Sequence, residues 1–145
     1  MDRRQASKIA AGSAAATALM GGAATAAQSH KHHIAANANE DLAREALACS
    51  RTGEACLKMC FDMLATGDNS MADCARSVRE LVIACDALAG MAIHDSKYLA
   101  TYAEVTSKIC NECREQCLAH EQHPQCRECA DACEQCANAC QEFLN

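Results

Sequence analysis

Thirteen cysteines dominate the chemistry available to this chain, and their spacing is regular. In the segment QCRECADACEQCANACQEFLN (125–145), Cys126, Cys129, Cys133, Cys136 and Cys140 recur at steps of three and four residues. At about 100° per residue these side chains fall within about 80° of one helical face. Between residues 125 and 141 there is no Leu, Ile, Val, Met or Phe, so thiols and alanine methyls must form the buried stripe. The face that an amphipathic helix normally fills with hydrocarbon carries soft sulfur ligands instead.

The other eight cysteines are spaced for three further helices, which we expect at about 39–66, 71–93 and 96–120, before a fourth that starts near Pro124. We expect Asn39, Ser70 and Ser96 to cap the first three helices, and Gly67 to end the first. The cysteines of these three helices again share one face of each helix. They are Cys49, Cys56, Cys60, Cys74, Cys85, Cys110, Cys113 and Cys117.

Short loops between these helices make neighbours antiparallel, so the fold class predicted for residues 39–145 is all-α, an up-down-up-down four-helix bundle with a cysteine-lined core. The turns at 67–70 and 120–124 then lie at one end of the bundle, and His94 and Asp95 at the other. Three methionines and two histidines gather at the first end, which we call the mouth. They are Met59, Met63, Met71, His120 and His123.

The composition limits the remaining function classes. At 145 residues with one proline and 3% aromatic residues, the chain has room for one domain with a narrow core of small side chains. The net charge of -6 and the lack of a basic stripe argue against a nucleic-acid partner. We find no set of residues suited to catalysis, so the chain is not expected to be an enzyme. Nor does any apolar run reach the length of a transmembrane helix.

The first residues read as an export signal. Arg3, Arg4 and Lys8 precede an alanine-rich, weakly apolar run that lacks acids, an arrangement similar to a twin-arginine signal. We expect cleavage after Ala26, so that residues 1–26 form the signal peptide. The expected destination is periplasmic or associated with internal membranes, reached through the twin-arginine pathway.

Residues 27–38 are expected to form a flexible, histidine-rich leader. His30, His32 and His33 could capture copper or a similar ion, although an exposed solubilising tail explains them equally well.

Pairs of thiols at positions i and i+4 suit a soft ion of low coordination number. Their Cβ atoms lie about 5 to 6 Å apart and point the same way, which a two-coordinate ion can bridge. Cu(I) is the thiophilic biological ion that accepts two or three sulfurs, so several Cu(I) ions per chain are expected. The thiol pairs spaced at i and i+4 are Cys56/Cys60, Cys113/Cys117, Cys129/Cys133 and Cys136/Cys140.

Other cysteine chemistries stay open at this point. A four-thiolate zinc site could form from Cys110, Cys113, Cys126 and Cys129, but it would leave nine cysteines unexplained. Iron–sulfur clusters meet the same objection, and a thiol oxidoreductase needs one exposed pair beside a strand. Disulfides between helices would give a structural bundle, although an odd number of cysteines prevents complete pairing. Methionines at the mouth are ordinary core residues or, alternatively, weak reversible Cu(I) ligands.

The chain resembles the bacterial four-helix-bundle copper storage proteins, in particular the exported type of methane-oxidising bacteria. The resemblance rests on CSRTGEACLKMCFDMLATGDNSMADC (49–74), CNECREQC (110–117) and CRECADACEQCANAC (126–140). It implies a homotetramer, many Cu(I) ions bound by pairs of cysteine thiolates, and a mouth lined by Met and His. It also implies a copper-receiving enzyme such as particulate methane monooxygenase.

One position departs from the family pattern. Met59 stands where the better-known relative has a histidine, so a thioether replaces a titrating group there. Two other roles stay open beside storage: a copper chaperone or detoxifying sink, and a disulfide-stapled structural bundle.

Overall fold

The computed structural model describes the backbone of residues 26–145 and the side chains from Ala38 onward. The predicted signal peptide, apart from Ala26, lies outside the described residues, and so do the side chains of the leader up to Asn37.

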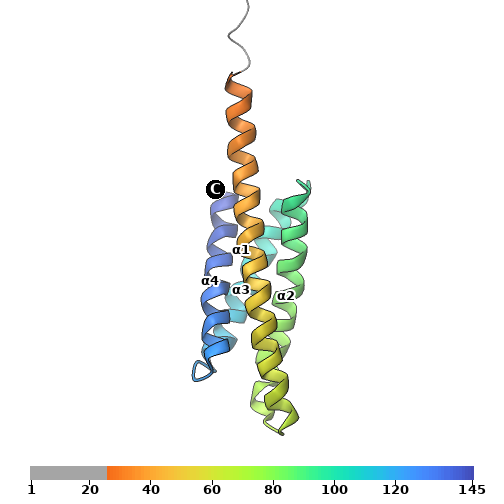
Figure 1. Ribbon diagram of the computed structural model, residues 1–145, viewed down its shortest axis with the longest axis vertical. Helices are drawn as coiled ribbons and strands as arrows, with labels where there is room; N and C mark the ends of the chain where they lie inside the picture. The colour runs from red at the N-terminus through yellow and green to blue at the C-terminus, as the bar shows by residue number, and fades with distance from the viewer. Residues whose placement is uncertain (1–25) are drawn as a thin grey trace, which may run out of the picture.

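The described chain is built from helices alone, and they run alternately up and down (Figure 1). This confirms the predicted all-α bundle. A short 3-10 helix, η1 (Asn69–Met71), precedes the second of the four α-helices. The α-helices are α1 (Ala26–Ala65), α2 (Ala72–Ile93), α3 (Leu99–Leu118) and α4 (Pro124–Leu144).

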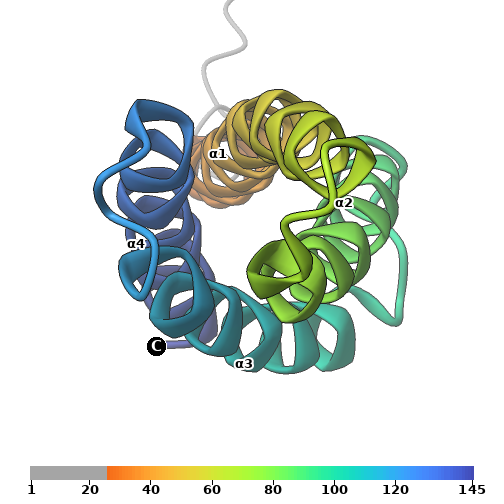
Figure 2. The same ribbon diagram turned by 90° about the horizontal axis from the view of Figure 1, so that it is seen from below.

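The four helices form a closed ring around a common axis, as the view along the bundle shows (Figure 2). Each helix packs against two others, in the order α1, α2, α3, α4 and back to α1. Within the described residues, the diagonal pairs α1/α3 and α2/α4 do not touch through their backbones. All four helices therefore contribute side chains to the axis.

The start of α1 differs from the prediction. The helix begins at Ala26 instead of near Asn39, and its first turns project beyond the other helices (Figure 1). Residues 26–52 contain no glycine or proline and are rich in alanine, the strongest helix former, so nothing in the sequence stops the helix earlier. Asn39 is therefore not an N-cap; its side-chain amide donates a hydrogen bond to Asp95 Oδ1 at 2.7 Å.

The predicted caps Ser70 and Ser96 are also wrong in detail. Asp68, not Ser70, caps η1, since its carboxylate accepts a hydrogen bond from the Ser70 amide at 3.0 Å. Ser96 lies three residues before α3, and its hydroxyl accepts from the Tyr98 amide at 3.3 Å. Ser70 therefore lies within η1 and Ser96 in the turn before α3, so neither caps an α-helix. The break at Gly67 is confirmed, because its φ of 90° favours glycine.

The core changes character along the axis. At the end that holds the α2–α3 turn, the buried residues are aliphatic, among them Leu42, Leu88 and Leu99. From Cys49 toward the other end they are mostly thiols. Within the described residues no helix combines the length and apolarity that crossing a membrane requires.

Candidate metal centre

All thirteen cysteines are free thiols with no exposed surface, so they form the interior of the bundle. Their closest Sγ–Sγ distances are 3.7 to 4.0 Å, far from the roughly 2.05 Å of a disulfide bond. The structure therefore contains no bridge of the kind that a disulfide-stapled bundle would need.

Ten of these thiols fall into three sets, and within each set the Sγ atoms all lie within 4.8 Å of one another. The four-thiol set takes one cysteine from each helix: Cys49, Cys85, Cys110 and Cys136.

The other two sets hold three thiols each and lie nearer the mouth. The first three-thiol set is Cys56, Cys74 and Cys117, from α1, α2 and α3. The second three-thiol set is Cys113, Cys129 and Cys133, from α3 and α4.

Two of the remaining thiols extend the first three-thiol set. Cys126 Sγ lies 3.7 Å from Cys56 Sγ, and Cys60 Sγ lies 3.8 Å from Cys74 Sγ. The two three-thiol sets are themselves joined, since Cys113 and Cys117 Sγ are 4.0 Å apart. A hydrogen bond between Cys133 and Cys49 continues these contacts to the four-thiol set, so sulfur lies along the axis from the mouth to that set.

Most of these contacts cross between helices, which the spacing along one helix could not reveal. Of the four pairs predicted at i and i+4, Cys113/Cys117 are in contact and Cys129/Cys133 share a set. The cross-helix groups depend on which cysteines stand at the same height in antiparallel helices. The loop lengths carry that signal, and counting residues outward from each turn could have found it.

The zinc site considered from the Cys-x-x-Cys spacing does not form. Cys110 belongs to the four-thiol set, whereas Cys113 and Cys129 belong to the second three-thiol set. Cys126 belongs to none of the three sets, so these four thiols do not converge on one point.

The methionines and histidines predicted at the mouth are at that end of the bundle. Met71 is fully buried, whereas Met59 and Met63 are partly buried and pack against the core. His120 and His123 lie in the turn between α3 and α4. Hydrogen bonds from Ser70 lower the pKa of Asp68, and the charges of both histidines add to this effect.

The thiols do not ionise alike. The pKa of Cys126 lies below that of an ordinary thiol because Cys117 and then Cys56 donate hydrogen bonds to its thiolate. Donation from Cys113 lowers the pKa of Cys129, and donation from Cys110 lowers that of Cys136. All three lie on α4, and the pKa of Cys49 on α1 is lowered as well, to about 6, chiefly by donation from Cys110.

Among the thiols that donate these hydrogen bonds, Cys110 and Cys117 have a raised pKa and are harder to ionise. The hydrogen bond to Cys136 raises the pKa of Cys110, and the hydrogen bond to Cys113 raises the pKa of Cys117, with burial acting in the same direction. Within the described residues the buried polar side chains are Ser50, Thr106 and Ser107, so no buried Lys or Arg balances a thiolate. A cation from outside is what this core needs in order to ionise fully.

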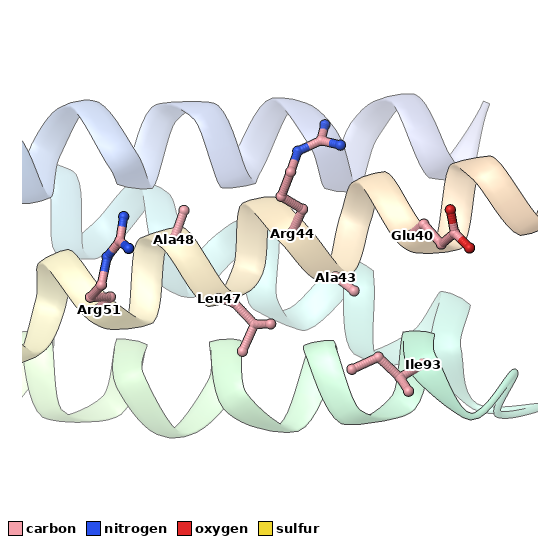
Figure 3. Close-up of a pocket in the computed structure, with 7 residues that line it drawn as sticks. All are labelled: Glu40, Ala43, Arg44, Leu47, Ala48, Arg51 and Ile93. Atoms are coloured by element: carbon pink, nitrogen blue, oxygen red, sulfur yellow. The ribbon is translucent and has the colours of Figure 1, made fainter.

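Among the described residues, the outer surface offers no comparable group of metal-ligating side chains. A hollow on α1 beside α2 is lined by side chains that include Arg44, Leu47, Arg51 and Ile93, and none of its lining residues is a thiol (Figure 3). Sulfur ligands are thus confined to the axis.

The comparison with known proteins agrees with this geometry. Residues 35–145 match the family model described as "Copper storage protein". The chain belongs to the copper storage protein family.

No curated protein matches the chain. Two similar structures are of a copper storage protein from Streptomyces lividans. One, with five coppers, is described as cytosolic and is 26% identical to this chain. The match covers 77% of this chain and 96% of that protein's chain, with a TM-score of 0.70. The other is loaded with 10 copper equivalents and is 27% identical, with coverage of 74% and 84% and a TM-score of 0.68.

A third structure supports the fold alone. It is a Cu(I)-bound copper storage protein with 23% identity, coverage of 74% of this chain and 99% of its own, and a TM-score of 0.69. Members of the copper storage protein family thus share this bundle at low sequence identity.

Proposed function

We propose that this member of the copper storage protein family stores many Cu(I) ions per chain on thiolates inside its bundle, rather than catalysing a reaction. The observation that carries the proposal is the interior itself: thirteen free thiols with no exposed surface and no buried cationic side chain among the described residues. Cu(I) is soft, takes two or three sulfur ligands and supplies the missing positive charge.

Charge balance indicates how many Cu(I) ions the core can hold. Each thiol that becomes a ligand releases its proton, and each Cu(I) brings one positive charge. A buried core avoids the cost of net charge only when these numbers are equal. With each sulfur bridging two ions and each ion held by two sulfurs, about one copper per thiol satisfies both the charge and the coordination.

Copper enters at the mouth in this proposal. Met59 and Met63 are partly buried there, and Met71 is fully buried. Neutral thioethers hold Cu(I) reversibly, whereas thiolates farther along the axis hold it tightly. The thirteen cysteines are therefore the storage ligands, and the three methionines, together with His120 and His123, assist transfer.

We further propose that the protein is exported through the twin-arginine pathway, assembles as a homotetramer and supplies a copper enzyme such as particulate methane monooxygenase. Export rests on Arg3, Arg4 and Lys8 ahead of the alanine-rich run. Fractionation of cells that express the full chain tests it. Mature protein outside the cytoplasm that begins at Ala27 is expected, and full-length protein confined to the cytoplasm would refute export.

A copper chaperone or detoxifying sink is the second candidate, because it would use the same ligands. A chaperone carries one or two ions and exchanges them quickly, so capacity separates it from a store.

Anaerobic titration of the reduced protein with Cu(I), in competition with a chelator, tests the storage proposal. About one copper bound per thiol is expected. Saturation near one copper per chain would overturn the storage proposal in favour of a chaperone.

A further inference from the structure

The four-thiol set differs from the rest of the core in the coordination number that it offers. Cys49, Cys85, Cys110 and Cys136 come from four different helices and converge on one point, with all Sγ atoms within 4.8 Å of one another. Zinc–sulfur bonds of about 2.3 Å in a tetrahedron set the sulfurs about 3.8 Å apart. Cys85 and Cys136 Sγ, at 4.0 Å, already have nearly this separation.

A tetrahedral divalent ion uses all four sulfurs of this set. Cu(I) is fully coordinated by two or three sulfur ligands, so it does not require a fourth. The three-thiol sets lack a fourth sulfur within the same mutual distance, so a four-coordinate ion has a single complete site among the described residues.

The surroundings hold this set in place before any ion binds. Next to Cys49 and Cys85, the Ser50 hydroxyl donates to Asp86 Oδ1 at 2.6 Å and ties α1 to α2. One turn before Cys110, the Ser107 hydroxyl accepts from Gln141 Nε2 at 3.1 Å and ties α3 to α4. Hydrogen bonds that fix both helix pairs near one layer favour a rigid site.

The aliphatic end of the core completes the enclosure. Leu88 lies one turn from Cys85 on α2 and Ala46 one turn from Cys49 on α1, and both are fully buried. The four sulfurs are therefore shielded from water on the side away from the mouth, which favours strong metal–thiolate bonding.

We propose that the four-thiol set binds one zinc ion in the copper-free protein, and that Cu(I) displaces this ion when the core fills. Zn²⁺ accepts four thiolate ligands in a tetrahedron, and four protons pass to solvent on binding. The zinc-loaded set then carries a net charge of -2, which one Cu(I) per thiolate removes on loading. No oxidation state changes in either step. During loading the thiolates pass from Zn²⁺ to Cu(I), which binds sulfur more strongly, and Zn²⁺ leaves. The zinc site does not depend on the storage proposal; only the displacement does.

Zinc in this position joins all four helices at one point. It stabilises the reduced bundle before copper arrives, because a metal that binds only the folded state adds its binding free energy to folding. It also occupies thiols that would otherwise be open to oxidation.

Anaerobic titration of the reduced protein with Co²⁺, a spectroscopic substitute for zinc, tests the site. One equivalent is expected to produce the intense visible bands of a tetrahedral thiolate complex, and Zn²⁺ is expected to bleach them. Absence of these bands, or their growth over several equivalents, would overturn the proposal.

Two cysteine variants give a matched comparison. Cys110→Ser removes one of the four ligands and is expected to abolish the tetrahedral Co²⁺ spectrum. Cys140→Ser removes a thiol of α4 outside the set and is expected to keep it. Circular dichroism checks that both variants fold, and both should lose about one copper of capacity. Equal effects of the two substitutions on the cobalt spectrum would refute the assignment.

Displacement is followed with a zinc-loaded sample. Cu(I) is expected to release one zinc per chain to a zinc-specific dye, and zinc retained in the fully copper-loaded protein would contradict it. If copper binds to capacity but zinc and cobalt do not, the zinc proposal fails and the storage proposal stands. If copper also fails to bind, the storage proposal fails independently.

Discussion

At the scale of single residues, the two ends of α4 are expected to behave differently. Cys126 begins the helix at the mouth and lies 3.7 Å from Cys56, whereas Cys140 lies near the aliphatic end. Cys126 also has a lowered pKa, through the hydrogen bonds from Cys117 and Cys56, so it presents a ready thiolate to the first incoming ions.

We therefore expect Cys126→Ser to slow the first phase of copper uptake severalfold, and Cys140→Ser to leave that phase unchanged. Both variants should lose about one copper of total capacity. Stopped-flow mixing with a coloured Cu(I) chelator complex measures the rates. Equal initial rates in the two variants would show that copper does not enter at the mouth.

Among the elements, α1 packs tightly against α2 where α1 carries a glycine. A Cβ atom at Gly53 would lie 3.0 Å from Val82 Cγ2 and 3.5 Å from Leu81 Cδ2. Val82 has little rotamer freedom in a helix, so it cannot move aside easily. This contact explains why a poor helix former occupies the middle of α1.

Gly53→Ala should therefore lower the free energy of unfolding by about 1 kcal/mol, because overpacking of about 1–3 kcal/mol exceeds the gain in helix propensity. Gly90→Ala in α2 is the matched control, since nothing lies within 4 Å of its added Cβ. That variant should gain about 1 kcal/mol. Urea unfolding of the metal-free protein measures both, and stabilisation by both substitutions would contradict the close packing of α1 on α2.

The sequence predicted the elements well wherever a local signal marks them. Cysteine periodicity defined the buried face of every helix, and Gly67 and Pro124 placed two boundaries. The start of α1 was wrong because the alanine-rich segment before Asn39 carries no stop signal. The grouping of Cys49 with Cys85, Cys110 and Cys136 was missed because it depends on the relative heights of four helices, which no pattern within one helix contains.

For the whole molecule, the buried thiols make stability depend on pH. Eight of them have a raised pKa, including Cys110 through its hydrogen bond to Cys136 and Cys117 through its hydrogen bond to Cys113. These thiols keep their protons in the folded state above the unfolded pKa of about 8.5, where the unfolded chain loses them. Their stabilisation is therefore present below that pH and is lost as pH rises.

Four other thiols have a lowered pKa, and they make the folded state less stable as pH falls. Donation from Cys110 first, then Cys133, lowers the pKa of Cys49 to about 6, and the pKa values of Cys126, Cys129 and Cys136 are also lowered. Their stabilisation is present above the unfolded pKa of about 8.5 and declines as pH falls toward the folded value. The metal-free bundle should consequently be most stable near pH 8.5.

Thermal melting of the metal-free protein from pH 6 to pH 10 is expected to show this maximum, with a steep loss above it. Copper-loaded protein should melt at a higher temperature throughout and lose the alkaline decline, because bound thiolates no longer titrate. Identical melting curves with and without copper would contradict the account of the core.

The most direct measurement of the central claim is the crystal structure of the copper-loaded protein, with anomalous scattering recorded at the copper edge. The account predicts a row of copper sites along the bundle axis, about as many as there are thiols, each bonded to cysteine sulfur. Copper confined to surface histidines and carboxylates, with the axial thiols unbound, would contradict it.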